Sequence, residues 1–536
     1  MKKLNSCIYI SGLLVLLTTG IACNNNLDEI TYSEVKEDAY KYTDPYKAMG
    51  IVYANMRGLF GHTTYSIAQE ASTDELVMPA NASGWDDGGI YKRMHLHTWN
   101  SENPQMANMW NSMYVGVSNA NRVIEQLDTG KIQMPAGLDK KNFVAEMRVA
   151  RAFFYWLLLD NFGDVPLVTT PLHGLASQES YPGKTPRKEV YQFVVNEILA
   201  AMPDLSEDID PQTYGRFNKW AAKALIANIY LNAEVYTGTP QWEACLAQCN
   251  DITGKYSLEP VYRDIFKTNN DHSPEIIFAI PFDENVAGGF YYEMFSWHGA
   301  FKARSNMQAT PWGSGSAMAI SQFIDTYDPS DQRLPDTWLM GPQRGMDGQP
   351  LLGSYDKAGK QLVLTKDLPD GLYTGESEGY RMNKFEVKVG AKPDLSNDFP
   401  FFRYAQVLMM KAECLLRTGH PDDAALLVTQ VRNRNFKTDP AKATVTGADL
   451  QKNTVYHYGY VQNYKITDTG DAAPVQYGRF LDELGWEFVW ESYRRRDMIR
   501  FGTYTKKSWL SHKPNGDERR IFPIPQEAIN ANPKLK

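Results

Sequence analysis

Hydrophobic residues recur every three or four positions over much of this chain, which is the spacing of one face of an α-helix. In residues 142–162, Phe143, Met147, Phe154 and Leu158 follow this spacing, and Gly163 is placed to end the helix. The same pattern predicts helices over residues 44–60, 109–127, 189–202, 219–236, 242–253, 402–418, 420–434 and 479–500. Alanine-rich helices in antiparallel pairs are typical of tetratricopeptide repeats, whose period is about 34 residues. We therefore predict a mainly α fold whose frame is a series of degenerate tetratricopeptide-like repeats.

The helical pattern is lost between about Tyr256 and Pro400. Glycine, proline, aspartate and aromatic residues dominate there, with short strand-like runs such as residues 276–281. Long irregular segments on a rigid frame usually carry recognition, so we expect a large loop-rich insertion with short strands. The predicted regions are a signal peptide at 1–22, a flexible tether at 23–43, a helical region at 44–255, a loop-rich ligand-binding region at 256–400 and a C-terminal helical region at 401–536.

The N-terminus has the features of an export signal. Two lysines precede an apolar run at residues 8–17, which is too short to span about 30 Å of hydrocarbon comfortably. Small residues at Gly20 and Ala22 precede Cys23, and this ending resembles the bacterial lipobox, in which the cysteine is lipid-modified and becomes the first mature residue. We predict Cys23 as a lipid anchor, with an ordinary secretory signal as the alternative. Asn24 follows the cysteine where Asp would indicate retention in the inner membrane. This position therefore resembles that of lipoproteins exported to the outer membrane.

The composition is that of a folded globular protein and narrows the classes of partner. Hydrophobic residues make up 43% of the chain and the formal net charge is -8, which argues against a nucleic-acid partner because such proteins carry basic patches. Beyond Cys7 and Cys23, the cysteines are Cys245, Cys249 and Cys414, too few for a disulfide framework. We expect buried free thiols, although Cys245 and Cys249 share a helix face on which a local disulfide is conceivable.

Four segments carry a family resemblance. They are residues 146–156 (EMRVARAFFYW) with 162–167 (FGDVPL), residues 215–225 (GRFNKWAAKAL), residues 402–413 (FRYAQVLMMKAE) with 431–434 (VRNR), and residues 483–488 (ELGWEF) with 491–497 (ESYRRRD) and the closing 523–525 (PIP). Together they resemble the SusD/RagB family of Bacteroidetes outer-membrane lipoproteins. Gln406 and Leu484 depart from the residues common in that family, Glu and Arg, and neither lies in the expected ligand region.

The resemblance implies a SusD-like fold and a non-catalytic glycan-binding lipoprotein, anchored in the cell outer membrane and exposed at the surface. Such a protein captures oligosaccharide or polysaccharide and delivers it to a SusC-like TonB-dependent transporter. The family also includes members linked to peptide uptake, so a RagB-like peptide-binding role is one alternative, and a glycoside hydrolase lipoprotein is another. We expect no cofactor and no metal.

Arginines are prominent in the family-like segments, and we interpret them as structural. Arg148 and Arg151 lie three residues apart on one helix face, and Arg432 and Arg434 lie near another helix end. Residues 494–497 follow Glu491 closely enough for ion pairs within one helix. Contacts between arginines and carboxylates would hold neighbouring helices together.

A sugar site needs flat apolar side chains for pyranose faces and polar groups for the hydroxyls. Two glycine-rich loops provide both, around Trp85 and between residues 291 and 315. The candidate ligand contacts are Trp85, Asp86, Tyr292, Trp297, Arg304, Asn306 and Trp312. The alternative for each tryptophan is burial under its loop. Trp338 is a weaker candidate, and Trp99, Trp110, Trp156 and Trp220 are expected in the core.

Two pairs of carboxylates are candidates for the catalytic residues of a glycoside hydrolase. Asp86 and Asp87, or Glu483 and Glu487, would have to face each other across a cleft at about 5–10 Å. Adjacent aspartates in a loop are more often turn formers, and Glu483 and Glu487 belong to a family-like segment that we interpret as structural.

Metal sites are the other alternative. His95 and His97 would project from one side of a strand, but the sequence offers no third ligand near them. Residues 269–271 (NND) could supply oxygen ligands to calcium, and a turn explains them equally well. Residues 313–315 (GSG) lack the strand–turn–helix context of a phosphate loop.

Overall fold

The computed structural model describes residues 44–171 and 180–536. The predicted signal peptide, the predicted anchor Cys23 and the predicted tether to residue 43 lie outside the described residues. No helix among the described residues is long and apolar enough to cross a membrane.

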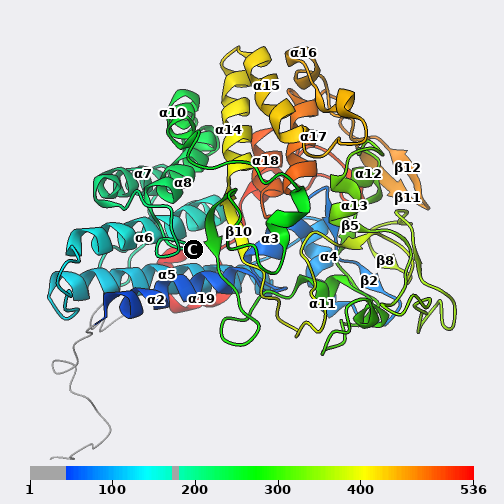
Figure 1. Ribbon diagram of the computed structural model, residues 1–536, viewed down its shortest axis with the longest axis horizontal. Coiled ribbons are helices and arrows are strands. Elements are labelled where there is room, and N and C mark those ends of the chain that lie inside the picture. Colours follow the sequence, from blue (N-terminus) through cyan, green and yellow to red (C-terminus); the bar gives the residue numbers. More distant parts are fainter. Residues whose placement is uncertain (1–43, 172–179) are drawn as a thin grey trace, which may run out of the picture.

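The predicted helical frame is confirmed (Figure 1). The α-helices are α2 (Pro45–Met56), α3 (Tyr65–Ala71), α4 (Ile90–His95), α5 (Pro104–Asp128), α6 (Lys140–Phe162), α7 (Arg187–Ala201), α8 (Lys219–Leu231), α9 (Ala233–Thr237), α10 (Trp242–Ile252), α11 (Tyr292–Ser296), α12 (Ser321–Ile324), α13 (Arg333–Thr337), α14 (Tyr404–Arg417), α15 (Pro421–Arg432), α16 (Gly447–Leu450), α17 (Gly478–Phe488), α18 (Arg494–Arg500) and α19 (Gln526–Ala531).

The long helices pack in succession, as tetratricopeptide-like helices do. Helix α6 packs between α5 and α7, α8 packs against α10, and α14 packs against α10 and α15. Ala221, Ala222 and Ala224 of α8 are fully buried, so these small side chains lie where neighbouring elements approach closely. Helix α6 starts where the Asp139 side chain accepts a hydrogen bond from the Lys141 amide, and it ends at Gly163 with a φ of 72°.

The strands are short and lie mostly in the loop-rich region. They are β1 (Leu76–Val77), β2 (Ala80–Asn81), β3 (Ile276–Ile280), β4 (Met318–Ala319), β5 (Trp338–Leu339), β6 (Gly341–Pro342), β7 (Val363–Leu364), β8 (Tyr373–Thr374), β9 (Arg381–Met382), β10 (Phe399–Arg403), β11 (Gly459–Gln462), β12 (Lys465–Asp468) and β13 (Trp509–Leu510).

The N-terminal segment that contains β1 and β2 is built into the loop-rich region. Strand β1 pairs antiparallel with β4, in a sheet of order β1-β4-β9-β5, and β2 pairs parallel with β8. Figure 1 shows α4, α11, β2 and β8 together on the lower right, away from α6, α7 and α10. Residues near position 80 are therefore held beside residues near positions 318 and 373.

Strands β3 and β10 pair antiparallel and are buried along their whole length. Strand β10 leads directly into α14, and Figure 1 places both at the junction between the helices on the left and the strands on the right. This pair therefore couples the loop-rich region to the helical frame.

Buried ion pairs surround this junction. The Arg403 guanidinium lies 2.7 Å from a carboxylate oxygen of each of Glu275, Glu487 and Glu491, and all four side chains are fully buried. The four residues lie before β3, at the end of β10, in α17 and in the turn after α17. One cation therefore links four separate segments.

Two further arginines extend this network. Arg434 pairs with Glu275 and Glu487 at 2.5 and 2.6 Å, and Arg333 pairs with Glu487 at 3.1 Å. Burial alone would raise the pKa of Glu487, but Arg434, Arg403 and Arg333 lower it to about 2. The carboxylate therefore stays ionised in the interior.

The structural interpretation of Arg148, Arg151, Arg432 and Arg434 agrees with these contacts. Arg148 and Arg151 of α6 both pair with Glu197, which lies in α7. Arg432 at the end of α15 pairs with a glutamate of α17. These arginines thus bridge neighbouring helices.

The prediction of one helix over residues 479–500 is wrong. Helix α17 ends at Phe488 and α18 begins at Arg494, because Trp490 and Ser492 adopt left-handed backbone conformations with φ of 70° and 68°. The predicted ion pairs from Glu491 to residues 494–497 are wrong as well. Glu491 pairs with Arg403 and Lys384, and Arg494 pairs with Asp74 at 2.7 Å.

The suggestion that His95 and His97 project from a strand is also wrong. His95 is the last residue of α4, and His97 follows it in a turn with a φ of 52°. Both rings are buried next to His512, where His95 Nε2 bonds Ser511 Oγ at 3.0 Å and His97 Nε2 bonds the Ser72 carbonyl at 2.8 Å. Burial lowers the pKa of both His95 and His97 to about 3, so the neutral rings are core residues.

The low pKa values of His95 and His97 predict that the folded protein loses stability in acid. The unfolded chain binds a proton on His95 near pH 6.5, whereas the folded chain does so only near pH 3, so stability falls as the pH decreases through that interval. We expect the difference in free energy of unfolding between wild type and His95→Gln to shrink by about 1.4 kcal/mol for each pH unit below 6.5. Urea unfolding at pH 7, 6, 5 and 4 measures it. A difference that is constant over this range would contradict the prediction.

The prediction of buried free thiols is confirmed. Cys245 and Cys249 of α10 and Cys414 of α14 are reduced and buried. Burial raises the pKa of the Cys245 thiol well above its usual value, and hydrogen bonds with the other two thiols act in the same direction. The three side chains therefore fill the contact between α10 and α14 as small hydrophobic groups.

Candidate functional site

The two loops that the sequence singled out meet in space. Asn81, at the end of β2, is buried, and its side-chain amide donates to the Gly315 carbonyl at 3.1 Å and to Ser316 Oγ at 2.9 Å. Its side-chain oxygen accepts from the Ser83 amide and hydroxyl, and its backbone amide donates to the Trp85 carbonyl. Asn81 thereby shapes the turn before Trp85 and ties it to the loop after Trp312.

Five aromatic side chains surround this junction: His62, Trp85, Tyr91, Tyr291 and Trp312, which we call the aromatic cluster. Trp312 lies with its ring centroid 5.3 Å from His62 and 5.8 Å from Tyr291. Trp85 stacks on Tyr91 at 5.5 Å with an interplanar angle of 26°, and the Tyr91 hydroxyl donates to the His62 carbonyl at 2.5 Å. The cluster is continuous from one loop to the other.

Exposure decides which of these rings can contact a ligand. Trp312 is 42% exposed, and His62, Trp85 and Tyr291 are half-buried, whereas Tyr91 is buried and supports Trp85 from below. The cluster therefore presents partly exposed aromatic faces, and the buried Tyr91 ring packs beneath Trp85.

The loop after Trp85 has an unusual backbone. Asp87, Gly88 and Gly89 have φ of 46°, 62° and 70°, and the two glycines adopt such angles without steric cost. Asp86 and Asp87 are exposed at this turn. Burial lowers the pKa of His62, and the nearby Asp87 carboxylate acts in the opposite direction. Exposed carboxylates thus border the aromatic cluster.

The other predicted contacts have different places. Tyr292 is fully buried in α11, and Trp297 is 4% exposed and donates from its indole nitrogen to the Met382 carbonyl at 2.7 Å. Trp297 is therefore buried under its loop, which is the alternative given above for each tryptophan. It also describes Trp338, which is buried. These three rings do not reach the surface in this structure.

Arg304 and Asn306 lie in and after a 3-10 turn at residues 299–304. Arg304 donates to the Gln343 side chain at 2.9 Å, and burial lowers its pKa. Asn306 is exposed in a left-handed turn with a φ of 48°. Trp85, Asp86 and Trp312 are thus the predicted residues that the structure brings together. Trp99, Trp110, Trp156 and Trp220 are in the core, as predicted.

Sequence reasoning missed His62, Tyr91 and Tyr291 as members of the cluster. The sequence favours Tyr292, but α11 begins at this residue and its side chain is buried, whereas Tyr291 before it is half-buried and lies in the aromatic cluster. His62 follows Gly61 in the turn between two helices, and that position was the available signal.

The remaining alternatives can be compared with the structure. Glu483 and Glu487 are fully buried in ion pairs, so they cannot meet a glycan in a cleft. Among residues 44–171 and 180–536, no group of three or more His, Cys, Asp or Glu side chains is arranged to hold a metal ion. Asn270 is buried, and its side chain bonds the backbone of Ile265 and Asp398, which fits the turn interpretation of residues 269–271.

Comparison with known proteins identifies the family of this chain. A family model described as "SusD family" matches residues 255–536, which is more than half of the chain. The chain belongs to the SusD family. A second model, described as "Starch-binding associating with outer membrane", matches residues 27–231.

Related SusD proteins cover most of the chain. The starch-binding protein SusD of Bacteroides thetaiotaomicron is 25% identical over 431 residues, which are 72% of this chain and 71% of that protein. SusD-like protein P25 of Formosa agariphila is 25% identical over 456 residues, which are 80% of this chain and 78% of that protein.

Solved structures share the SusD fold. Surface glycan-binding protein A of B. thetaiotaomicron in complex with laminarihexaose has a TM-score of 0.67 at 19% identity, covering 92% of this chain and 98% of that one. A laminarin-binding SusD-like protein has a TM-score of 0.66 at 19% identity, covering 93% of this chain and 99% of that one. The predicted SusD-like, mainly helical fold is confirmed.

Proposed function

We propose that this SusD protein is a non-catalytic glycan-binding protein whose ligand lies on the aromatic cluster. The observation that carries the proposal is that Trp85 and Trp312, two partly exposed rings from loops more than 200 residues apart, belong to one cluster joined through Tyr91 and His62. Flat aromatic faces match the apolar faces of pyranose rings, and Asp86 and Asp87 can accept hydrogen bonds from sugar hydroxyls. The names of related proteins, which include starch-binding and laminarin-binding members, support a glycan as the ligand class.

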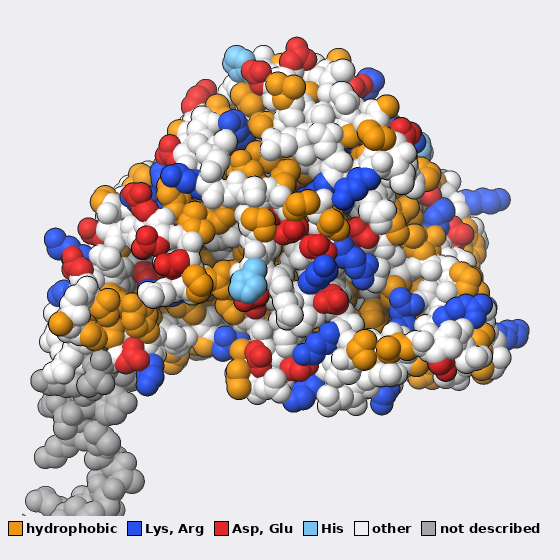
Figure 2. All heavy atoms as spheres, viewed as in Figure 1, with side chains coloured by type: hydrophobic (Ala, Val, Ile, Leu, Met, Phe, Trp, Pro, Cys, Tyr) orange, Lys and Arg blue, Asp and Glu red, His pale blue; other side chains and the backbone are white. Residues whose placement is uncertain are grey.

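Charge supports a glycan over a nucleic acid. The formal net charge is -8. On the face in Figure 2, lysine and arginine side chains are interspersed with aspartate and glutamate, without one continuous basic patch. A phosphate backbone needs such a patch.

The finer parts of the proposal concern location and delivery. A lipid on Cys23 would hold the protein at the outer membrane, which fits the description of the family model that matches residues 27–231. From there the protein would pass oligosaccharide to a SusC-like TonB-dependent transporter. A peptide ligand, as in RagB-like uptake, is the competing proposal.

A binding panel tests this function. Affinity electrophoresis and calorimetry against neutral glycans, acidic glycans and peptides should give binding for at least one glycan and none for the peptides. Prolonged incubation should leave that glycan intact. Glycan cleavage, or binding of peptides alone, would overturn the proposal.

Separating the two loops should weaken glycan binding. A Cβ on Gly313 would collide with Ser83 Oγ, which belongs to the turn before Trp85. We expect Gly313→Ala to push the two loops apart and to lower glycan affinity about tenfold, as measured by calorimetry. Gly348→Ala is the matched control, because its φ of 77° is also left-handed, against 57° for Gly313, but its Cβ meets open space. Equal affinities of the two variants would contradict this prediction.

A further inference from the structure

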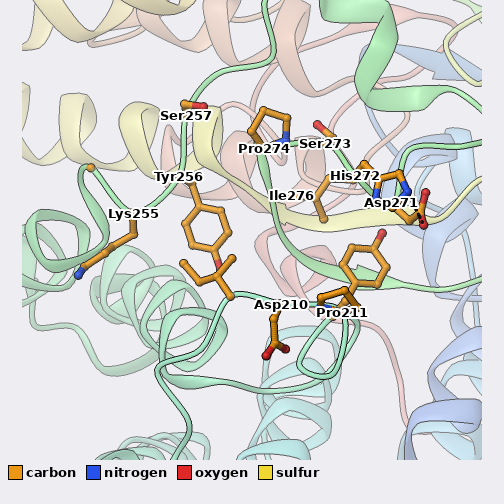
Figure 3. Close-up of a pocket in the computed structure, with 13 residues that line it drawn as sticks. Asp210, Pro211, Lys255, Tyr256, Ser257, Asp271, His272, Ser273, Pro274 and Ile276 are labelled. Atoms are coloured by element: carbon orange, nitrogen blue, oxygen red, sulfur yellow. Dashed lines mark ion pairs between the residues drawn. The ribbon is translucent and has the colours of Figure 1, made fainter.

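A second hollow lies away from the aromatic cluster, between three loops beside β3 (Figure 3). Its volume is about 600 Å³, which is in the range of small-molecule sites. The loops are residues 209–214, 254–257 and 271–276, and they contribute two tyrosines, Tyr214 and Tyr256, to the wall. We call this hollow the tyrosine pocket.

The wall of the tyrosine pocket is rigid. Tyr214 donates its hydroxyl hydrogen to Asp398 Oδ2 at 2.8 Å, and Gly215 next to it packs so closely on Pro281 that a Cβ there would collide. The Ser257 amide donates to the Pro274 carbonyl at 3.1 Å, which joins the other two loops. The pocket is therefore largely formed before any ligand arrives.

The chemistry of the tyrosine pocket is aromatic and acceptor-rich. Because the Tyr214 hydroxyl hydrogen is committed to Asp398, the phenol oxygen offers a ligand only its lone pairs. Asp210 and Asp271 add exposed carboxylates at the mouth. Figure 3 shows the Tyr256 ring pointing from its own loop toward the loop of Asp210, while Lys255 extends to the left, away from Asp210.

The basic side chains nearby have partners of their own. The Lys255 ammonium lies 4.8 Å from the centroid of the Trp220 ring, and His272 Nε2 lies 3.5 Å from Asp271 Oδ2. The pocket therefore suits a ligand that donates several hydrogen bonds and presents an apolar face, and its carboxylates disfavour an anion.

We infer that the tyrosine pocket is a second saccharide site, which binds a short neutral oligosaccharide independently of the aromatic cluster. Hydroxyl groups supply the donors, and a pyranose face covers the Tyr256 ring. The inference rests on the proposed function, because the ligand is the same class of glycan.

One packed core separates the two sites. Asp398 Oδ1 accepts from the Phe282 amide at 3.0 Å, Phe282 packs on Phe290 at 5.3 Å, and Phe290 precedes Tyr291 of the aromatic cluster. This core fixes the sites relative to each other, so a polysaccharide long enough to reach both would be held at two points. Two weak sites on one chain raise the overall affinity for a long ligand.

Calorimetry with short neutral oligosaccharides, chosen from the panel because the full protein binds them, tests the inference. Wild type should bind two equivalents, and the Trp85→Ala/Trp312→Ala variant should retain one. Adding Tyr256→Ala to that variant should lower the remaining affinity at least about tenfold. Tyr256→Leu should do the same while keeping apolar volume in the wall, which guards against a folding defect. Tyr464→Ala, at an exposed tyrosine between β11 and β12, is the control and should change neither binding event.

The outcomes separate the two proposals. If wild type binds a single equivalent of oligosaccharide and the Trp85→Ala/Trp312→Ala variant binds none, the second site is overturned and the proposed function stands. A single equivalent that survives in the tryptophan variant and is lost with Tyr256→Leu would overturn the aromatic cluster as the glycan site. No binding by any glycan of the panel would overturn both. Binding of oligolysine at the tyrosine pocket in place of glycan would also overturn the second site.

Discussion

Replacing Trp85 and Trp312 together by alanine is expected to remove glycan binding at the aromatic cluster. Buried or stacked tryptophans commonly contribute about 2 kcal/mol each to an interface, which is about thirtyfold in affinity for one ring. The two rings come from separate loops and contact different neighbours, since Trp85 stacks on Tyr91 and Trp312 meets His62 edge to face, so their losses should be close to additive. The glycan affinity of the aromatic cluster should therefore fall about a thousandfold in the double variant. Calorimetry would then no longer detect binding at the cluster.

Variants of intermediate chemistry sharpen this result. Trp312→Phe keeps a flat ring and should lose much less affinity than Trp312→Ala. Tyr464→Ala removes an exposed aromatic ring from the turn between β11 and β12 and should have no effect. Circular dichroism and thermal unfolding should show that all these variants fold. Unchanged affinity in the folded double variant would show that glycan binds elsewhere.

Replacing Arg403 by methionine is expected to lower the free energy of unfolding by about 3–5 kcal/mol. The substitution keeps much of the apolar side-chain volume but leaves Glu275, Glu487 and Glu491 without their shared cation in the interior. A buried carboxylate that loses its partner bears the full cost of its lost hydration. Urea unfolding of wild type and variant measures the difference.

The matched control is Arg122→Met, at an exposed arginine of α5 that bonds only a neighbouring asparagine among the contacts described for it. Its effect should stay within about 0.5 kcal/mol. A small effect of Arg403→Met would mean that the neighbouring Arg434 and Lys384 compensate, and it would contradict the central role given to Arg403.

The network also explains how the aromatic cluster depends on residues far from it. Arg403 holds β10 to the segment before β3, and these strands form the junction between the helical frame and the loop-rich region. The aromatic cluster lies in that region, on loops held by Asn81 and by short strands. A fold that fails at the junction therefore loses the surface as well.

Local patterns were enough to predict the helical frame. Phe143, Met147, Phe154 and Leu158 belong on one face of α6 whatever lies around it, because helical spacing is a property of the backbone. Asp139 and Gly163 at its ends act within one turn of the helix. The prediction failed at residues 489–493, where left-handed backbone at Trp490 and Ser492 turns the chain so that Glu491 reaches Arg403.

The candidate site was only partly predictable, for a related reason. The composition of two loops pointed to Trp85 and Trp312, but which rings remain exposed depends on what packs over each loop. Trp297 differs from Trp312 because its indole nitrogen finds the Met382 carbonyl inside the protein. Tyr291 and Tyr292 differ because a helix starts between them.

By itself, the sequence determined the helical frame, the buried thiols and the family-like arginine segments, because each rests on spacing along the backbone or on residue chemistry. Only the tertiary structure decided that Trp85 and Trp312 share one surface, that Glu491 pairs with Arg403 and that Tyr214 and Tyr256 line one pocket. These are contacts between segments far apart in the chain. They follow from how loops are held by Asn81, Arg403 and Asp398, and no local pattern records that.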